Sequence, residues 1–178
     1  YYVMLQGPLV GNVILGCSIG LSIVYNGWSK WGRLPSWLAE LALALSVGGL
    51  CLAGIFIQTQ IIPLNASLFT IALVLILLQL NSVPSGLKDI KADMAVGARS
   101  FIIELGSRIN QNGQIAHPKI LWWYSAILQL SIVGILIWLP IELMLAWWLK
   151  SLIVLLVIYA TLHLRLLLTI SDNHLLYK

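Results

Sequence analysis

The sequence predicts an all-α protein, a polytopic bundle of membrane-spanning helices with about five spans and one long polar segment. Three observations predict this class. Of the 178 residues 60% are hydrophobic and only 9% are charged, whereas soluble domains are about one-quarter charged and a single globule of this size cannot hide so much apolar surface. The apolar residues fall in five runs, each long enough to cross a hydrocarbon core of about 30 Å. Eight Trp and six Tyr suit a membrane–water interface.

The five runs define the expected spans, which cover residues 9–28, 36–57, 64–84, 119–139 and 146–168. Prolines stand near their edges, where a residue without an N–H is tolerated: Pro8, Pro35, Pro63, Pro118 and Pro140. The last run has an alternative reading, in which Trp147, Trp148 and Lys150 form an interfacial segment and the span starts near Ser151.

No internal repeat or flexible linker divides the chain, so we treat residues 1–178 as one membrane domain. The chain begins with Tyr1 and Tyr2, without Met, and ends soon after an apolar run. We therefore expect it to be part of a longer protein.

Basic residues occupy alternate connections between the expected spans. Segment 29–35 holds Lys30 and Arg33, and segment 85–118 holds four further cations, whereas 58–63 and 140–141 hold none. The positive-inside rule then places 29–35 and 85–118 on the cytoplasmic side. Because the basic residues are scattered over loops, the net charge of +4 indicates topology, and no nucleic-acid partner is expected.

The polar segment 85–118 carries an acidic pair, Asp89 and Asp93. If the preceding helix continues past Gly86, the two carboxylates share one face. Like charges at this spacing repel by a few tenths of a kcal/mol, and a divalent cation would reverse that sign. Magnesium is typically held by one or two carboxylates together with substrate phosphates. The spacing alone is equally compatible with a solvated loop that carries ordinary charges.

Four other residues are candidates for binding a diphosphate beside this pair. Arg99 can bind phosphate oxygens through two parallel hydrogen bonds, and Lys88 and Lys91 add positive charge. Asn81 lies two turns before Asp89, on about the same helical face. Its alternative role is a hydrogen bond to a neighbouring helix.

The order of these residues resembles a known motif. Asp89 and Asp93 are followed by Gly97, Arg99 and Ser100, and then by Leu105-Gly106. This series is similar to the second aspartate-rich motif of the UbiA-type membrane prenyltransferases. A weaker similarity joins Pro8-Leu9-Val10-Gly11-Asn12-Val13 to a Gly-Asn segment that opens a helix in many of those enzymes.

The resemblance implies a bundle of about nine spans that transfers an isoprenyl group from a prenyl diphosphate to a lipophilic acceptor in the membrane. It implies Mg²⁺ as cofactor and Asp89 and Asp93 as the catalytic residues that hold the Mg²⁺–diphosphate, beside the residues given above as candidates for binding the diphosphate: Asn81, Lys88, Lys91 and Arg99. The family's first aspartate-rich motif is absent from this sequence, so we expect the enzyme to be incomplete in this chain.

A different class of function stays open beside the enzyme. A transporter or channel fragment would have the same apolar layout, with the charged segment as a solvated loop. Against it, Asp89 and Asp93 fall in a basic segment between spans, whereas transport sites cluster near the bilayer midplane. The acceptor (an aromatic compound, a quinone precursor or a lipid) and the length of the isoprenoid chain are not encoded in any pattern we find.

Overall fold

A computed structural model of the chain describes residues 9–29, 34–111, 115–142 and 147–169. The predictions that rest on Pro8, Lys30 and Arg33 lie outside the described residues. In chain order, the elements are α2 (Leu9–Val24), η1 (Tyr25–Ser29), α3 (Ser36–Thr59), α4 (Leu64–Leu80), η2 (Asn81–Ser85), α5 (Gly86–Val96), α6 (Phe101–Glu104), β1 (Arg108–Ile109), β2 (Ile115–Ala116), α7 (Lys119–Glu142) and α8 (Trp147–Thr169).

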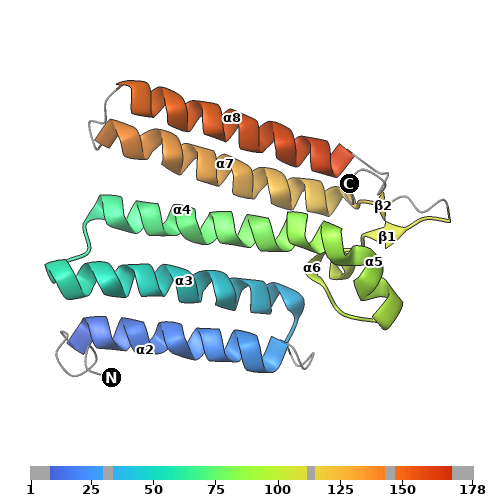
Figure 1. The fold of residues 1–178 in the computed structure, drawn as a ribbon, viewed down its shortest axis with the longest axis horizontal. Helices are drawn as coiled ribbons and strands as arrows, with labels where there is room; N and C mark the ends of the chain where they lie inside the picture. Colours follow the sequence, from blue (N-terminus) through green and yellow to red (C-terminus); the bar gives the residue numbers. More distant parts are fainter. Residues whose placement is uncertain (1–8, 30–33, 112–114, 143–146, 170–178) are drawn as a thin grey trace.

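The long helices run alternately in opposite directions, and each packs against its neighbour in the chain. Helix α3 lies between α2 and α4, α7 packs against α4, and α8 packs against α7 (Figure 1). Helices α5 and α6 and the short antiparallel pair β1–β2 gather at one end of this row of helices. That end therefore carries nearly all of the irregular structure.

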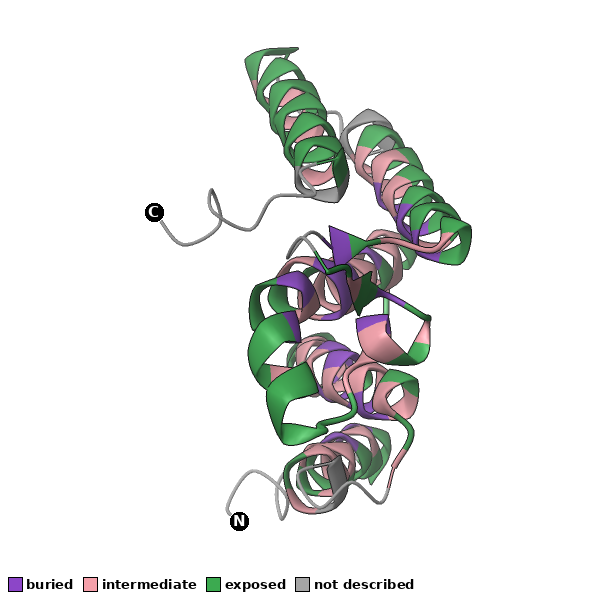
Figure 2. Cartoon of the chain, turned by 90° about the vertical axis from the view of Figure 1, so that its right-hand side faces the viewer, coloured by how far each residue is buried: buried purple, intermediate pink, exposed green. Residues whose placement is uncertain are grey.

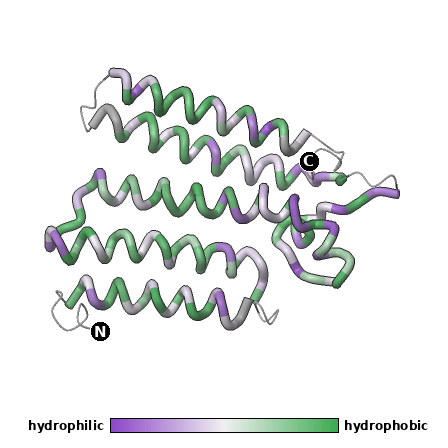
Figure 3. Tube along the Cα trace, viewed as in Figure 1, coloured by the Kyte–Doolittle hydropathy of each residue, from purple (hydrophilic) through white to green (hydrophobic). Residues whose placement is uncertain are grey.

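Five helical stretches are long and apolar enough to cross a membrane, as predicted: Leu9–Gly27, Ser36–Thr59, Leu64–Val96, Lys119–Leu139 and Trp147–Leu166. Their apolar side chains are largely uncovered, with Leu155 63% exposed and Trp123 69% exposed. Hydrophobic residues run along all the long helices, and hydrophilic ones concentrate at the end with α5 and the hairpin (Figure 3). These features are compatible with an integral multi-pass membrane protein.

The segment between the third and fourth spans differs from the expectation. The segment 85–118, expected as a loop, contains α5, α6 and the β1–β2 pair. It folds because its own apolar residues pack together, as described below. The last run forms one helix, α8, from Trp147 to Thr169, and both readings of where its span starts are compatible with that helix.

Small residues bring α2, α3 and α4 close together. A Cβ added at Gly49 would lie 2.1 Å from the Ser18 hydroxyl oxygen of α2, and one added at Gly48 would lie 2.4 Å from a methyl group of Val74 in α4. Both distances are far below van der Waals contact. Gly48 and Gly49 are therefore packing residues, as expected for helices that approach closely in a membrane, whereas Gly54 of the same helix has no neighbouring atom within 4 Å of an added Cβ.

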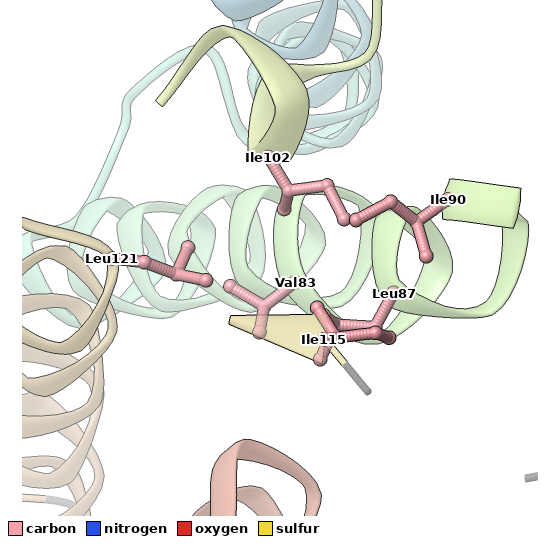
Figure 4. Close-up of a cluster of buried hydrophobic side chains, with 6 residues drawn as sticks. All are labelled: Val83, Leu87, Ile90, Ile102, Ile115 and Leu121. Carbon is pink, nitrogen blue, oxygen red and sulfur yellow. The ribbon is translucent and has the colours of Figure 1, made fainter. Parts of the chain in front are cut away.

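A compact apolar cluster supports the end of the molecule that carries the acidic pair. It joins residues from η2, α5, α6, β2 and α7: Val83, Leu87, Ile90, Ile102, Ile115 and Leu121 (Figure 4). Each such side chain contributes about 1.5–3 kcal/mol when fully buried. Figure 2 shows buried residues in this region, whereas α8 is mostly exposed. The cluster holds α6 and the hairpin against α5.

Candidate functional site

The helix that carries the acidic pair is a continuation of α4. The chain stays helical from α4 through the π-turn η2 into α5, and Pro84 lies inside that turn. Proline lacks the N–H that a regular helical turn would use, and π-turns are frequent at functional sites. The condition for Asp89 and Asp93 to share a face is therefore met. The sequence signal for the turn, a proline within a helical pattern, was not used in the prediction.

Glycines define the shape of the motif. Gly97 ends α5 in the left-handed conformation, with φ of 68°, which costs glycine little. The next N–H, that of Ala98, then donates to the carbonyl of Asp93 at 2.8 Å, closing the helix. At the other end, a Cβ on Gly86 would lie 3.2 Å from Ile102. Glycine at these two positions lets the chain turn at the end of α5, just after Val96, and pack α6 against α5.

Asp89 and Asp93 line a polar cavity of about 120 Å³ at this end of the bundle. Asn81 lines it too, so three of the predicted site residues come together. The other lining residues come from α3, η2, α5 and α6: Glu40, Ser82, Ser85, Gly86, Ser100 and Phe101. Oxygen atoms of carboxylates, hydroxyls and an amide therefore dominate its polar surface.

The three predicted cations take a different position. Lys88 and Lys91 are exposed on α5, and Arg99 is exposed just after it. None of the three lines the cavity. Their part in binding a diphosphate stays a prediction.

Glu40 is the lining residue that sequence reasoning missed. It lies in the second turn of α3, and its Oε2 atom is buried with no hydrogen-bond partner. Ser100 Oγ, also at the cavity, is buried without a partner as well. Buried polar atoms of this kind destabilise a protein unless something pairs with them. The available signal was an acidic residue inside an apolar span, which by default marks a functional position.

Aromatic residues lie beside the cavity and connect it to α7. The Tyr124 hydroxyl and Ser82 Oγ are 3.1 Å apart and share a hydrogen bond. The rings of Tyr124 and Phe101 have centroids 4.9 Å apart. Tyr124 is half-buried, whereas its neighbour Trp123 points to an exposed surface. Tyr124 is thus the aromatic residue of this part of α7 that faces the site.

Glu104 fastens the segment after the motif to the start of α3. Its carboxylate accepts hydrogen bonds from the backbone N–H of Ser36 at 3.2 Å and from the Ser36 hydroxyl. A negative charge is favourable at a helix N-terminus, where N–H groups lack partners. The contact also keeps the first turns of α3, and with them Glu40, next to α5 and α6.

The donor set suits a hard cation but does not form a complete cage. Within the described ranges, no three or more His, Cys, Asp and Glu side chains converge as metal ligands. Glu40 lines the cavity without completing such a set. Magnesium is commonly held by one or two carboxylates, with waters and substrate phosphates filling its remaining positions. The residues present fit that mode of binding.

No protein-family model, curated protein or solved structure matches this chain. The functional argument consequently rests on the cavity and on the residues that line it.

Proposed function

We propose that the protein transfers an isoprenyl group from a prenyl diphosphate to a lipophilic acceptor in the membrane. The observation that carries the proposal is the polar cavity at the end of an apolar bundle, where Asn81, Asp89 and Asp93 lie together with Glu40. The motif-like order of Gly97, Arg99 and Ser100 after the aspartates supports the same assignment.

Asp89 and Asp93 are the residues that would hold Mg²⁺ with the diphosphate. The metal supplies a positive charge that stabilises the leaving diphosphate. Arg99, Lys88 and Lys91 on the exposed side of the motif add positive charge for the diphosphate oxygens. Asn81 offers an amide at the cavity wall for a further hydrogen bond.

The reaction breaks the bond between the allylic carbon of the prenyl group and a diphosphate oxygen. The acceptor atom forms the new bond to that carbon and then loses a proton. Tyr124 and Phe101 place aromatic faces beside the cavity, and such faces stabilise a cationic carbon. The apolar cluster under the motif excludes water from that side, which protects a reactive cation.

The proposal includes a topology and a larger fold. We place the end of the molecule with α5, α6 and the hairpin on the cytoplasmic side, because basic residues concentrate in the connections at that end. We also propose that the five helices belong to a bundle of about nine spans, in which a second acidic motif faces Asp89 and Asp93.

The test is prenyl transfer by membranes that contain the whole protein, with all of the proposed spans and the second acidic motif, and with aromatic, quinone-precursor and lipid acceptors. We expect Asp89→Asn and Asp93→Asn each to lower the rate at least about hundredfold, since each removes metal-binding charge. Glu142→Gln is the matched control, because it removes a carboxylate from the last turn of α7, at the opposite end of the bundle from the cavity (Figure 1). Equal rates in the wild type, the two aspartate variants and the control, at matched expression, would contradict the assignment of Asp89 and Asp93 as metal-binding residues.

A further inference from the structure

A second and larger cavity lies between α4, α7 and α8. Its volume is about 460 Å³, within the range of about 300–1,000 Å³ that is typical of small-molecule sites. It shares no lining residue with the aspartate cavity. The turn η2 separates the two, because it contributes Pro84 to the larger cavity and Asn81 to the smaller one. The larger cavity is thus a distinct site.

The walls of this cavity indicate an elongated apolar ligand. Aliphatic side chains from three helices provide most of the surface, among them Ile76, Ile132 and Leu156. On α8 the lining extends from Ile153 to Leu164, which corresponds to about 16 Å of helix. A hydrocarbon chain or a chain with a small ring would fill such a space.

One polar group in the cavity has no partner. Gln79 is only 7% exposed, and its amide nitrogen is buried without a hydrogen-bond partner. Gln129, which also lines the cavity, differs because its amide donates to the Thr161 hydroxyl at 2.8 Å. A buried donor that lacks an acceptor destabilises the protein. An oxygen supplied by a ligand would satisfy Gln79.

We propose that this cavity binds an elongated lipophilic molecule that places a carbonyl-type oxygen against the Gln79 amide. Two of the lining residues on α8, Tyr159 and His163, have stacked rings with centroids 6.0 Å apart. This pair gives the cavity a flat wall. The required chemistry, a hydrocarbon chain with a carbonyl oxygen, occurs both in bilayer lipids with ester groups and in free lipophiles such as quinones. The proposal does not depend on prenyl transfer, because none of the aspartate-site residues takes part.

The test is photolabelling of the purified chain in lipid nanodiscs, with labelled peptides mapped by mass spectrometry. One probe is a phosphatidylcholine with a diazirine in its acyl chain, and the other is a diazirine-tagged decylbenzoquinone. Two variants alter the site: Gln79→Leu removes the donor, and Ala160→Phe fills the space. Gln58→Leu and Ala126→Phe are matched controls at exposed positions outside the cavity.

We expect saturable labelling of cavity residues in the wild-type protein and in both controls. Gln79→Leu should weaken it about fivefold, the loss of one hydrogen bond to a neutral group, and Ala160→Phe should abolish it. If unlabelled decylbenzoquinone prevents the labelling of cavity residues, the ligand of the cavity is a free lipophile. If the phosphatidylcholine probe still labels these residues in its presence, the ligand is a bilayer lipid.

A second readout separates ligand binding from a structural role of Gln79. In lipid-free detergent with no probe added, Gln79→Leu should melt at a higher temperature than the wild type, because it removes an unpartnered buried donor. A glutamine that serves the fold would instead lower the melting temperature when replaced. Unchanged labelling in Gln79→Leu, or labelling spread evenly over the exposed face of α8, would overturn the proposal.

Discussion

Glu40 shows at the scale of one residue how the structure changes the interpretation of the sequence. In the sequence it is a single acid within an apolar run, with no acidic neighbour in the chain. In the structure it lines the same cavity as Asp89 and Asp93, and its Oε2 atom has no hydrogen-bond partner. A bound cation would offset the cost of burying that carboxylate.

Replacement of Glu40 by Gln should therefore separate binding from stability. The amide keeps the shape and removes the charge, so we expect the ligand-free protein to become more stable by about 1 kcal/mol. Binding of Mg²⁺ with inorganic diphosphate should become about tenfold weaker. Thermal melting and a Mg²⁺ titration of the variant measure both effects. A variant that is less stable and binds as well as the wild type would show that Glu40 has a structural role only.

At the scale of elements, the acidic pair depends on contacts that are distant in sequence. Asp89 and Asp93 share a face because α4 continues through η2 into α5, a continuation that could be stated from the sequence only as a condition. The position of α6 beside α3 depends instead on Glu104 and Ser36, 68 residues apart, and no local pattern indicates such a pair. The packing of Ile102 against Gly86 could not be predicted from a local sequence pattern either.

The Glu104–Ser36 contact predicts a measurable coupling. Glu104→Gln should lower stability by about 0.5–1 kcal/mol, since it weakens a cap at the start of α3. Ser36→Ala should cost less in the Glu104→Gln background than in the wild type, because the two residues interact. Thermal unfolding in detergent of the wild type, the two single variants and the double variant gives the double-mutant cycle. Strictly additive effects would contradict the contact.

The stability of the protein should depend on pH through a histidine at the junction between the β1–β2 hairpin and α7. His117 lies just before α7, and both of its ring nitrogens are buried without hydrogen-bond partners. Burial lowers the pKa of the His117 imidazole below its usual value of about 6.5. The unfolded state then binds the proton more readily, so the stabilisation is present above about pH 6.5 and is lost as the pH falls through the lowered folded-state pKa.

His117→Gln should remove that pH dependence, because the amide does not titrate. We expect the wild-type protein to lose more thermal stability than the variant when the pH is lowered from 7.5 to 5.5. Other titrating groups are common to both proteins and cancel in the comparison. Parallel melting curves over this interval would contradict a lowered folded-state pKa of His117, because the folded and unfolded states would then bind the proton equally well.

At the scale of the whole molecule, hydropathy alone predicted the five long helices to within a few residues at most ends. The third is the exception, because the span expected to end at residue 84 belongs to a helical stretch that continues to Val96. Apolar run length reports the part of a helix that crosses lipid, and it carries no information on a polar helical extension. The larger cavity was not predicted either, since it depends on how α4, α7 and α8 pack.

The proposed topology predicts which positions react with a membrane-impermeant thiol reagent. In a background with Cys17 and Cys51 replaced by Ala, a single cysteine at Ala98 should be protected in intact cells and react after the membrane is opened. A cysteine at Ile61, at the opposite end of the bundle, should react in intact cells. The reverse pattern would invert the orientation, and equal reactivity at both positions would contradict a spanning arrangement of α3 and α4.

The most direct test of the account is binding of a divalent cation and diphosphate at Asp89 and Asp93. Mn²⁺ suits the same oxygen ligands as Mg²⁺, and its electron paramagnetic resonance spectrum reports the bound fraction. In lipid nanodiscs, the wild-type protein and the control Glu142→Gln should bind Mn²⁺ in the presence of inorganic diphosphate. The double variant Asp89→Asn/Asp93→Asn should bind it at least about tenfold more weakly. Equal binding by the double variant and the wild type would contradict the assignment of this cavity as a metal–diphosphate site.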